Sequence, residues 1–238
     1  MSPLKPLAVF ALVAVGCLNS PQSPPKPLAR DAVTGDVPWA DQVAAVKAGE
    51  SDRIYLAKTP IGDEQLDELA GLTELRDLLL DESRVTADGL KKLTKVPGLE
   101  HLRLRGAEVD DAALEAVSAV KTLRIVNLPH GRFTDAGVKP LLALPNLVQV
   151  RLGSEKLTDD ALVDLAGKTS LLRIHLIRAP ITDAGLARIH GQNHLQSLYL
   201  DKSQVTEDGV RKLFAGIKDI HVHLDQRHID NDPNADDH

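Results

Sequence analysis

One apolar position recurs every 24 residues through most of this 238-residue chain. It is occupied by Ile61, Val85, Val109, Phe133, Leu157, Ile181 and Val205. A fixed repeat of about 20–29 residues predicts a solenoid, in which each unit packs against its neighbours, rather than a globular domain. No unit can bury its apolar side chains alone, so we expect the repeats to fold as one stack.

Each unit opens with the pattern of a short strand. Leu75, Leu78 and Leu80 show the spacing, and the alternation at its end is typical of a strand with one buried face. The same pattern starts at Leu99, Leu123, Leu147, Leu171 and Leu195. An incomplete first copy holds Ile54 and Leu56, and a last copy holds residues 220–224.

A helix start follows each recurring apolar residue. Suitable N-cap residues come directly after it: Gly62, Thr86, Asp110, Thr134, Thr158, Thr182 and Thr206. Acidic residues follow at Asp135, Asp159, Asp183 and Glu207, and we expect their carboxylates to lie at the positive end of the helix dipole. Apolar pairs three residues apart, such as Leu186 and Ile189, predict the buried helix face.

Two stretches carry a family resemblance: FTDAGVKPLLALPNLVQVRL (133–152) and ITDAGLARIH (181–190). They resemble the units of bacterial leucine-rich repeat proteins that read V-T-D-x-G-L, and the resemblance covers residues 50–225. It implies an α/β fold, a leucine-rich repeat solenoid: a right-handed β-α superhelix with a curved parallel sheet on the concave face and helices on the convex face. It does not specify a function, because this scaffold serves many partners.

One position departs from the family pattern. The slot three residues after the last strand leucine is usually Asn or Cys. Here it holds Ser83, Ala107, Gly131, Glu155, Ala179 and Ser203. We expect the side chain of Glu155 to turn outward.

The ends of the repeat array need caps. Trp39, Val43 and Val46 share one helical face and predict an N-terminal helical cap over residues 39–49. The last strand, residues 220–224, has no helix after it, which predicts a poorly capped C-terminal end. The repeat domain is therefore assigned to residues 39–225.

The N-terminal segment is typical of export. Residues 1–16 contain Lys5 and an apolar run, residues 7–15, that is too short to span a bilayer and fits a signal peptide. AVGC (14–17) resembles a lipobox, which implies that Cys17 is lipidated. An ordinary cleaved signal or an unrelated apolar tail are the alternatives.

Two polar segments flank the repeats. Residues 17–38 are rich in proline and predict a semi-extended linker from the lipid anchor. Residues 226–238 are acidic and poor in apolar residues, which predicts a disordered tail.

Composition and motifs narrow the function. A net charge of −6 and a pI near 5.8 argue against general nucleic-acid binding, which depends on a basic surface. AGKTS (166–170) imitates a phosphate loop, but Leu162 stands where that loop needs its first glycine. We expect no catalytic residue and no cofactor.

The outward strand side chains should line the concave face. The candidate binding residues are Tyr55, Arg103, Arg105, Asn127, Arg151, Arg173, His175 and Tyr199. Four of them are arginines near the centre, whereas Asp81, Asp201 and Asp225 lie towards the ends. This pattern predicts a protein or peptide partner, favours an acidic one, and makes the tyrosines candidate anchors. The alternative is a solvated face of mixed charge.

The sequence thus favours a monomeric, non-catalytic protein-binding module at the bacterial cell envelope, in contact with the lipid membrane through Cys17. The anchor implies the outer membrane or cell surface, and without lipidation a secreted or periplasmic protein. A structural envelope spacer without a specific ligand is the alternative. His221, His223 and Asp225 could hold a metal, but no second rigid ligand pair accompanies them, so no metal site is predicted.

Overall fold

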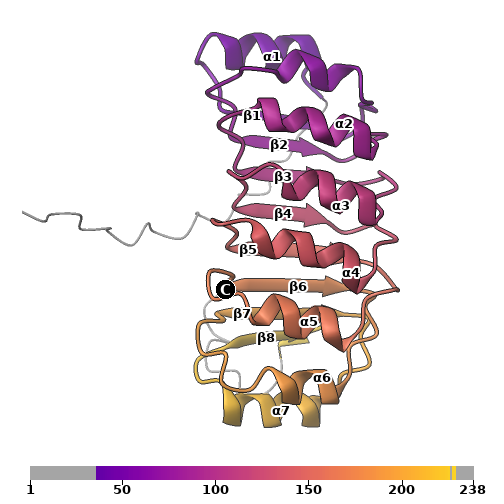
Figure 1. Ribbon diagram of the computed structural model, residues 1–238, viewed down its shortest axis with the longest axis vertical. Coiled ribbons are helices and arrows are strands. Elements are labelled where there is room, and N and C mark those ends of the chain that lie inside the picture. Colours follow the sequence, from indigo (N-terminus) through magenta and orange to yellow (C-terminus); the bar gives the residue numbers. More distant parts are fainter. Residues whose placement is uncertain (1–35, 226, 229–238) are drawn as a thin grey trace, which may run out of the picture. The chain divides into compact units, whose positions relative to one another are not determined.

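The computed structural model describes residues 36–225 and 227–228. Its strands follow one another in chain order in one open sheet (Figure 1). Eight are parallel: β1 (Arg53–Leu56), β2 (Asp77–Leu80), β3 (His101–Leu104), β4 (Ile125–Leu128), β5 (Gln149–Gly153), β6 (Arg173–Ile177), β7 (Ser197–Asp201) and β8 (His221–Leu224). The ninth, β9 (Arg227–His228), is antiparallel to β8.

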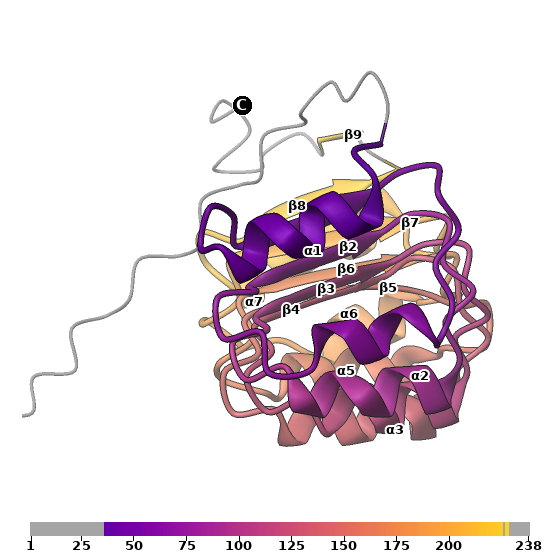
Figure 2. The same ribbon diagram turned by 90° about the horizontal axis from the view of Figure 1, so that it is seen from above.

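The helices form a second layer. They are α2 (Ala87–Lys92), α3 (Asp111–Ser118), α4 (Asp135–Val138), α5 (Asp159–Ala166), α6 (Asp183–Arg188) and α7 (Glu207–Gly216). Short 3-10 segments, η1 (Gln65–Leu69), η2 (Leu93–Lys95) and η3 (Lys139–Ala143), replace or extend helices in some units. Helices α2 to α6 lie along one side of the sheet (Figure 2). We call the opposite side of the sheet the concave face.

The sheet register equals the sequence period. Tyr55 pairs with Leu79, Leu79 with Arg103, and every later strand keeps the offset of 24 residues. The resulting column on the concave face is Tyr55, Leu79, Arg103, Asn127, Arg151, His175, Tyr199 and His223. The predicted α/β repeat solenoid and its predicted strand faces are therefore confirmed.

The recurring apolar residues form part of one continuous core. Ile61, Val85, Val109, Phe133, Leu157 and Ile181 are buried, and Val205 is half-buried against the same core. Glu155, at the repeat position that usually holds Asn or Cys, is exposed, as expected. Ser154 occupies the buried place instead, and its hydroxyl donates to the Phe133 carbonyl at 2.7 Å.

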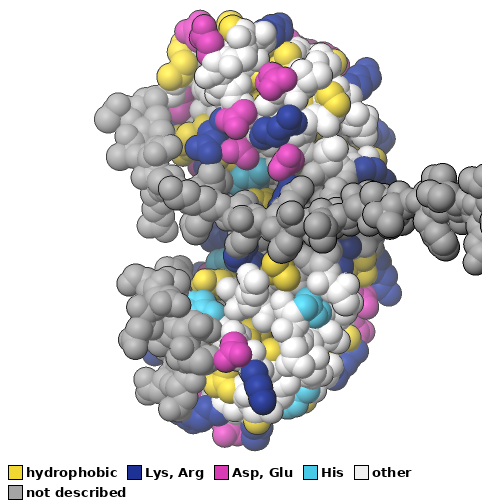
Figure 3. Space-filling view, turned by 90° about the vertical axis from the view of Figure 1, so that its left-hand side faces the viewer, with side chains coloured by type: hydrophobic (Ala, Val, Ile, Leu, Met, Phe, Trp, Pro, Cys, Tyr) yellow, Lys and Arg dark blue, Asp and Glu magenta, His cyan; other side chains and the backbone are white. Residues whose placement is uncertain are grey.

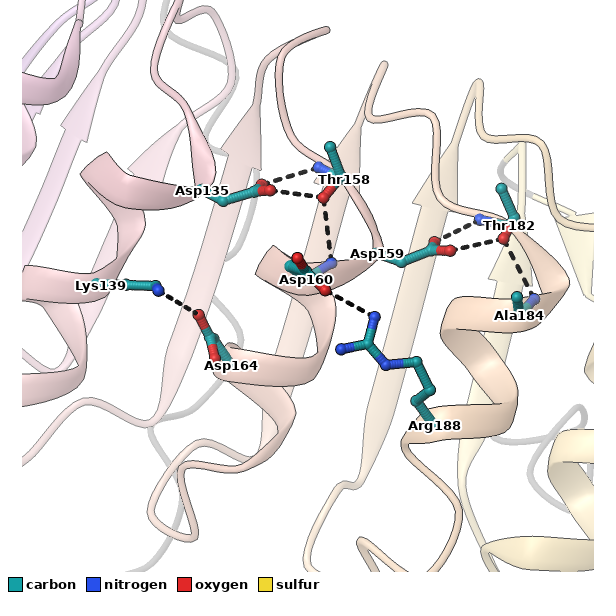
Figure 4. A network of polar contacts seen from close by, with 9 residues as sticks. All are labelled: Asp135, Lys139, Thr158, Asp159, Asp160, Asp164, Thr182, Ala184 and Arg188. Atoms are coloured by element: carbon teal, nitrogen blue, oxygen red, sulfur yellow. Dashed lines mark hydrogen bonds and ion pairs between the residues drawn. The ribbon is translucent and has the colours of Figure 1, made fainter.

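An aspartate–threonine ladder links successive helices (Figure 4). In each rung one carboxylate accepts the backbone N–H and the hydroxyl of a threonine 23 residues later, at 2.5 to 2.8 Å. The rungs are Asp63–Thr86, Asp111–Thr134, Asp135–Thr158, Asp159–Thr182 and Asp183–Thr206. Three of the four carboxylates that we expected at a helix dipole, those of Asp135, Asp159 and Asp183, therefore bind the N-cap residue of the next helix along the stack, whereas Glu207 pairs with Arg211 of its own helix at 3.2 Å.

The ladder explains the T-D-x-G motif. The threonine hydroxyls of Thr86, Thr158, Thr182 and Thr206 also accept a backbone N–H at the start of their own helix, as predicted for N-caps. Thr134 makes no such bond. In four of the five rungs a helix glycine three positions on leaves room for the incoming carboxylate, since a Cβ at Gly89, Gly137, Gly185 or Gly209 would overlap it. The Asp135–Thr158 rung has Ala161 there and forms the same bonds, so glycine is not indispensable.

The N-terminal helix completes the open edge of β1. Helix α1 (Trp39–Lys47) buries Val43 and Val46 and packs Trp39 against the core, which agrees with the predicted cap. The side chain of Gln42 accepts the N–H of Tyr55 at 2.7 Å and donates to its carbonyl at 2.9 Å. One glutamine therefore makes the two hydrogen bonds that a neighbouring strand would make.

The C-terminal end differs from the expectation of an uncapped strand. Strand β9 pairs with β8, with Arg227 opposite Leu224 and His228 opposite His223. These two residues fall within the segment that we expected to be a disordered tail. Antiparallel pairing of only two residues covers part of an edge that would otherwise carry unpaired backbone groups.

Several predictions concern residues that the structure does not describe. The signal peptide, Cys17 and all of the linker before residue 36 lie outside the described residues, as do residue 226 and the tail from 229. Within the described residues, no helix has the length and apolar character needed to cross a membrane.

Candidate protein-binding site

All eight predicted binding residues lie half-buried on or beside the concave face. They are Tyr55, Arg103, Arg105, Asn127, Arg151, Arg173, His175 and Tyr199. Five of them occupy the central column from β3 to β7, on adjacent strands. Because the strands fix the backbone positions, these side chains form a preformed surface.

The arginines at the N-terminal half are already paired. Arg103 places Nε 2.8 Å from Oδ1 of Asp81, and its Nη2 donates to Oδ2 at 2.9 Å. The Arg103 guanidinium carbon lies 4.9 Å from the centre of the Tyr55 ring, and Nη1 of Arg105 lies 3.6 Å from the same carboxylate. Arg103 was predicted to belong to a basic centre, but Asp81 offsets much of its charge.

A second carboxylate, that of Asp77, also pairs with basic side chains on the N-terminal half of the concave face. Asp77 lies 3.0 Å from Nε of Arg53 and 3.5 Å from Nδ1 of the buried His101. Burial acts to raise the pKa of Asp77, but the hydrogen bonds and charges of His101 and Arg53 outweigh it, so the pKa is lowered. Acidic and basic side chains are also interspersed over the N-terminal half of the flank that faces the viewer in Figure 3.

The C-terminal half contains a three-residue chain of hydrogen bonds. Nε of Arg151 donates to Nδ1 of His175 at 3.2 Å, so the proton of the neutral ring is on Nε2, 2.8 Å from Oδ2 of Asp201. Burial lowers the pKa of His175, and the charge of Arg151 lowers it further, against the opposing effect of Asp201. The neutral imidazole thereby holds Arg151 and Asp201 in fixed positions.

Aromatic rings adjoin this chain. Tyr199 lies between His175 and His223, with ring centres 5.3 Å and 4.6 Å away. His221 and His223 point the same way, as predicted, and their Nε2 atoms are 2.6 Å apart. Within the described residues, no group of three or more potential ligands is placed to hold a metal.

Two further concave residues differ from the paired arginines. Within the described part of the chain, Arg173 forms no ion pair. Oδ1 of Asn127 is buried without a hydrogen-bond partner among the described residues. Buried polar atoms are normally satisfied, so a partner that offers a donor above β4 would complete this site.

A pocket of about 320 Å³ opens beside these strands and is here named the edge pocket. Its lining is Arg105, Pro129, His130, Arg151, Ile177, Asp201 and Lys202. Burial lowers the pKa of His130, and the positive charges of Arg178, Arg105 and Arg151 lower it further. The pocket therefore has a local excess of positive charge.

Sequence reasoning missed His130, Arg178 and Lys202 as site residues. They follow β4, β6 and β7 directly, or nearly so, and share one position of the 24-residue period. Basic residues at one repeat position were a usable signal, but the predicted concave columns end one position earlier, at Pro129, Ile177 and Asp201.

No protein-family model matches the sequence, and no curated protein matches it. The similarity to solved structures is structural. Internalin C2 from Listeria monocytogenes aligns with 81% of this chain and 98% of its own, at 16% identity and a TM-score of 0.54.

The chain folds as a leucine-rich repeat solenoid. A leucine-rich repeat protein of Leptospira interrogans matches 79% of this chain at 16% identity and a TM-score of 0.52, although this chain spans only 52% of that protein. Human 5T4, also titled Wnt-activated inhibitory factor 1 and trophoblast glycoprotein, matches 81% of this chain and 73% of its own, at 20% identity and a TM-score of 0.55. Identities this low establish the fold alone.

In this leucine-rich repeat solenoid, His175 is poorly suited to general base catalysis. A general base needs a free ring nitrogen to take a proton. Nδ1 of His175 accepts from Arg151 and Nε2 faces Asp201, so both nitrogens are occupied. The arrangement holds a surface in place.

Proposed function

We propose that this chain is a non-catalytic module that binds a protein or peptide through its concave face. The observation that carries the proposal is the half-buried central column from Arg103 to Tyr199, held by strand register and internal hydrogen bonds. Side chains that are ordered before binding lose less conformational entropy on binding. Tyrosine and arginine are also the residue types that dominate binding hot spots.

The internal ion pairs change which residues should recognise the partner. Arg103 and Arg105 already contact Asp81, so they contribute less to attraction of an acidic partner than their number suggests. Arg173 forms no ion pair with a described residue, and Tyr199 lies on the next strand, two residues after Ser197, the register partner of Arg173. We therefore place recognition on the C-terminal half of the concave face, around β5 to β7.

Site-specific cross-linking tests this proposal in the producing organism. A photoreactive amino acid at position 173 should give a discrete cross-linked product. The matched control carries the photoreactive amino acid at position 188, which is an exposed arginine of α6 on the helical side, and should give no product. Failure of position 173 to give a product would contradict the proposal and favour a structural spacer.

We further propose that the mature protein is tethered to the bacterial cell envelope by a lipid on Cys17. The support is the position of this single cysteine directly after a short apolar run, followed by a proline-rich segment. Mass spectrometry of the protein and of Cys17→Ser should detect acyl mass in the parent alone. A parent without acyl mass leaves the secreted or periplasmic alternative.

A further inference from the structure

The edge pocket combines two kinds of lining. Arg105, Arg151 and Lys202 bring positive charge to it, whereas buried Pro129 and half-buried Ile177 bring apolar surface. Its carboxylate, Asp201, is held by His175 at 2.8 Å. The pocket therefore favours a group that is both anionic and apolar.

Backbone conformation marks the same place. Arg178 and Lys202 have φ angles of 57° and 55°, in the left-handed region that side chains other than glycine rarely adopt. The equivalent residue after β3 is Gly106, with φ 75°. Such conformations cost on the order of 1 kcal/mol each, and they cluster at binding sites. Here the residues held in this conformation are both cations.

Two cations near the pocket, Arg178 and Lys202, have no ion-pair partner within the described chain, whereas Arg105 lies 3.6 Å from Asp81. Nε of Arg178 is also buried without a hydrogen-bond partner there. The pKa of His130 is lowered mainly by burial, and the neighbouring positive charges lower it further because they disfavour another cation. A bound anion would relieve this repulsion and offer acceptors to the guanidinium groups.

Size limits the ligand. At about 320 Å³, the pocket lies at the lower end of the roughly 300–1,000 Å³ typical of ligand sites. That volume suits one amino-acid residue. An inorganic anion would leave Pro129 and Ile177 uncovered, whereas an apolar group beside the anion would cover them.

We propose that the edge pocket binds a carboxylate that carries an adjacent apolar group, supplied by the partner peptide. This assignment deepens the proposed function and rests on it, because the pocket adjoins β4 to β7 at the C-terminal half of the concave face. The carboxylate has two sources with the same chemistry. One is the C-terminus of a chain that ends in an apolar residue, and the other is an acidic side chain next to an apolar one.

Titration of the isotope-labelled protein, followed by nuclear magnetic resonance, tests the pocket without the natural partner. The probes are N-acetyl-leucine, N-acetyl-leucinamide, acetate, inorganic phosphate and N-acetyl-glutamyl-leucinamide. We expect saturable shifts of the Ile177, Arg178 and Lys202 amides with at least one of the two probes that join a carboxylate to an apolar side chain. The tighter of these two identifies the source, and N-acetyl-leucinamide should bind at least tenfold more weakly than that tighter probe.

A charge-matched pair of variants checks specificity. Arg105→Gln with Lys202→Gln should weaken the tighter probe at least tenfold. Arg211→Gln with Lys212→Gln removes the same charge from exposed positions of α7 and should leave binding unchanged. Retained amide spectra verify that the variants are folded.

Three results would overturn the inference: no saturable shift with either apolar carboxylate, equal affinity for phosphate or acetate, or equal loss in both pairs of variants. The cross-linking at position 173 distinguishes the two proposals. A product there without probe binding removes the pocket assignment alone, and its absence removes the proposed function.

Discussion

At the scale of single residues, neighbouring side chains of unequal size compensate for each other. Phe133 is fully buried at a position where the other units carry Ile, Val or Leu. Two residues before it stands Gly131, where a Cβ would overlap the phenyl ring. Two residues before Val109 stands Ala107, so that unit combines a smaller apolar residue with a larger neighbour. The two positions together thus fill a similar volume in these two units, although the residues differ.

This compensation predicts coupled stability effects. Gly131→Ala should destabilise by about 1–3 kcal/mol through overpacking, and Phe133→Val by about 2–4 kcal/mol through the cavity it leaves. Together they recreate the Ala107–Val109 combination, so the double variant should be more stable than the sum of the two losses by at least about 0.5 kcal/mol. Urea denaturation of the four proteins measures the coupling. Additive losses would show that the two sites relax independently.

At the scale of one unit, the aspartate–threonine ladder has a missing rung. Ala87 occupies the aspartate position, and the residue 23 places later is Asp110 instead of threonine. Asp110 caps its own helix by accepting the N–H of Ala113 at 3.0 Å. An aspartate at 87 would face this carboxylate. The unit that lacks the aspartate at position 87 is therefore followed by one that lacks the threonine at position 110.

Restoring the rung should require both changes. Ala87→Asp alone should destabilise through repulsion between carboxylates, and Asp110→Thr alone should be close to neutral, since both residues are good N-caps. The free energy of unfolding of the double variant should exceed that of Ala87→Asp by about 1 kcal/mol or more, because two hydrogen bonds to a carboxylate replace the repulsion. Ala136→Asp adds a carboxylate to an exposed helix start without a rung and controls for the dipole effect. Equal stability of Ala87→Asp and the double variant would refute the rung.

The ladder also shows what sequence could and could not predict. The 24-residue period predicts strand faces, the concave columns and six of the seven N-cap positions, because these depend mainly on backbone position. The exception is Gly62, since the 3-10 segment η1 after it has Glu64 at its N-cap position. It does not predict that Arg103 turns to Asp81 or that Arg151 turns to His175, because long side chains have several rotamers and respond to their neighbours. The edge pocket depends on the loops after the strands, where the period makes Gly106, Arg178 and Lys202 equivalent but does not predict their left-handed backbone conformation.

At the scale of the whole domain, the two edges of the parallel sheet are the places that need protection from association. An open edge presents unpaired backbone groups and invites association with another chain. Strand β9 pairs with β8 at one end. At the other end, Asp36 accepts the N–H groups of Ala57, Lys58 and Thr59 at 2.7 to 2.8 Å, and Gln42 pairs with the backbone of Tyr55. Neither device has a repeat period, which is why sequence analysis identified only the apolar face of α1.

The Gln42 side chain gives the sharpest test of this edge. Gln42→Ala should destabilise the domain by about 1–3 kcal/mol, because the N–H and the carbonyl of Tyr55 lose their partners. It should also increase self-association, since the freed edge of β1 can pair with another copy. Denaturation measures the first effect and sedimentation velocity the second. Lys47→Ala, an exposed change on the same helix, should alter stability by no more than about 0.5 kcal/mol. If Gln42→Ala matched Lys47→Ala in both measurements, the edge would be protected by the packing of α1 alone, and the strand-like hydrogen bonds of Gln42 would be incidental to the fold.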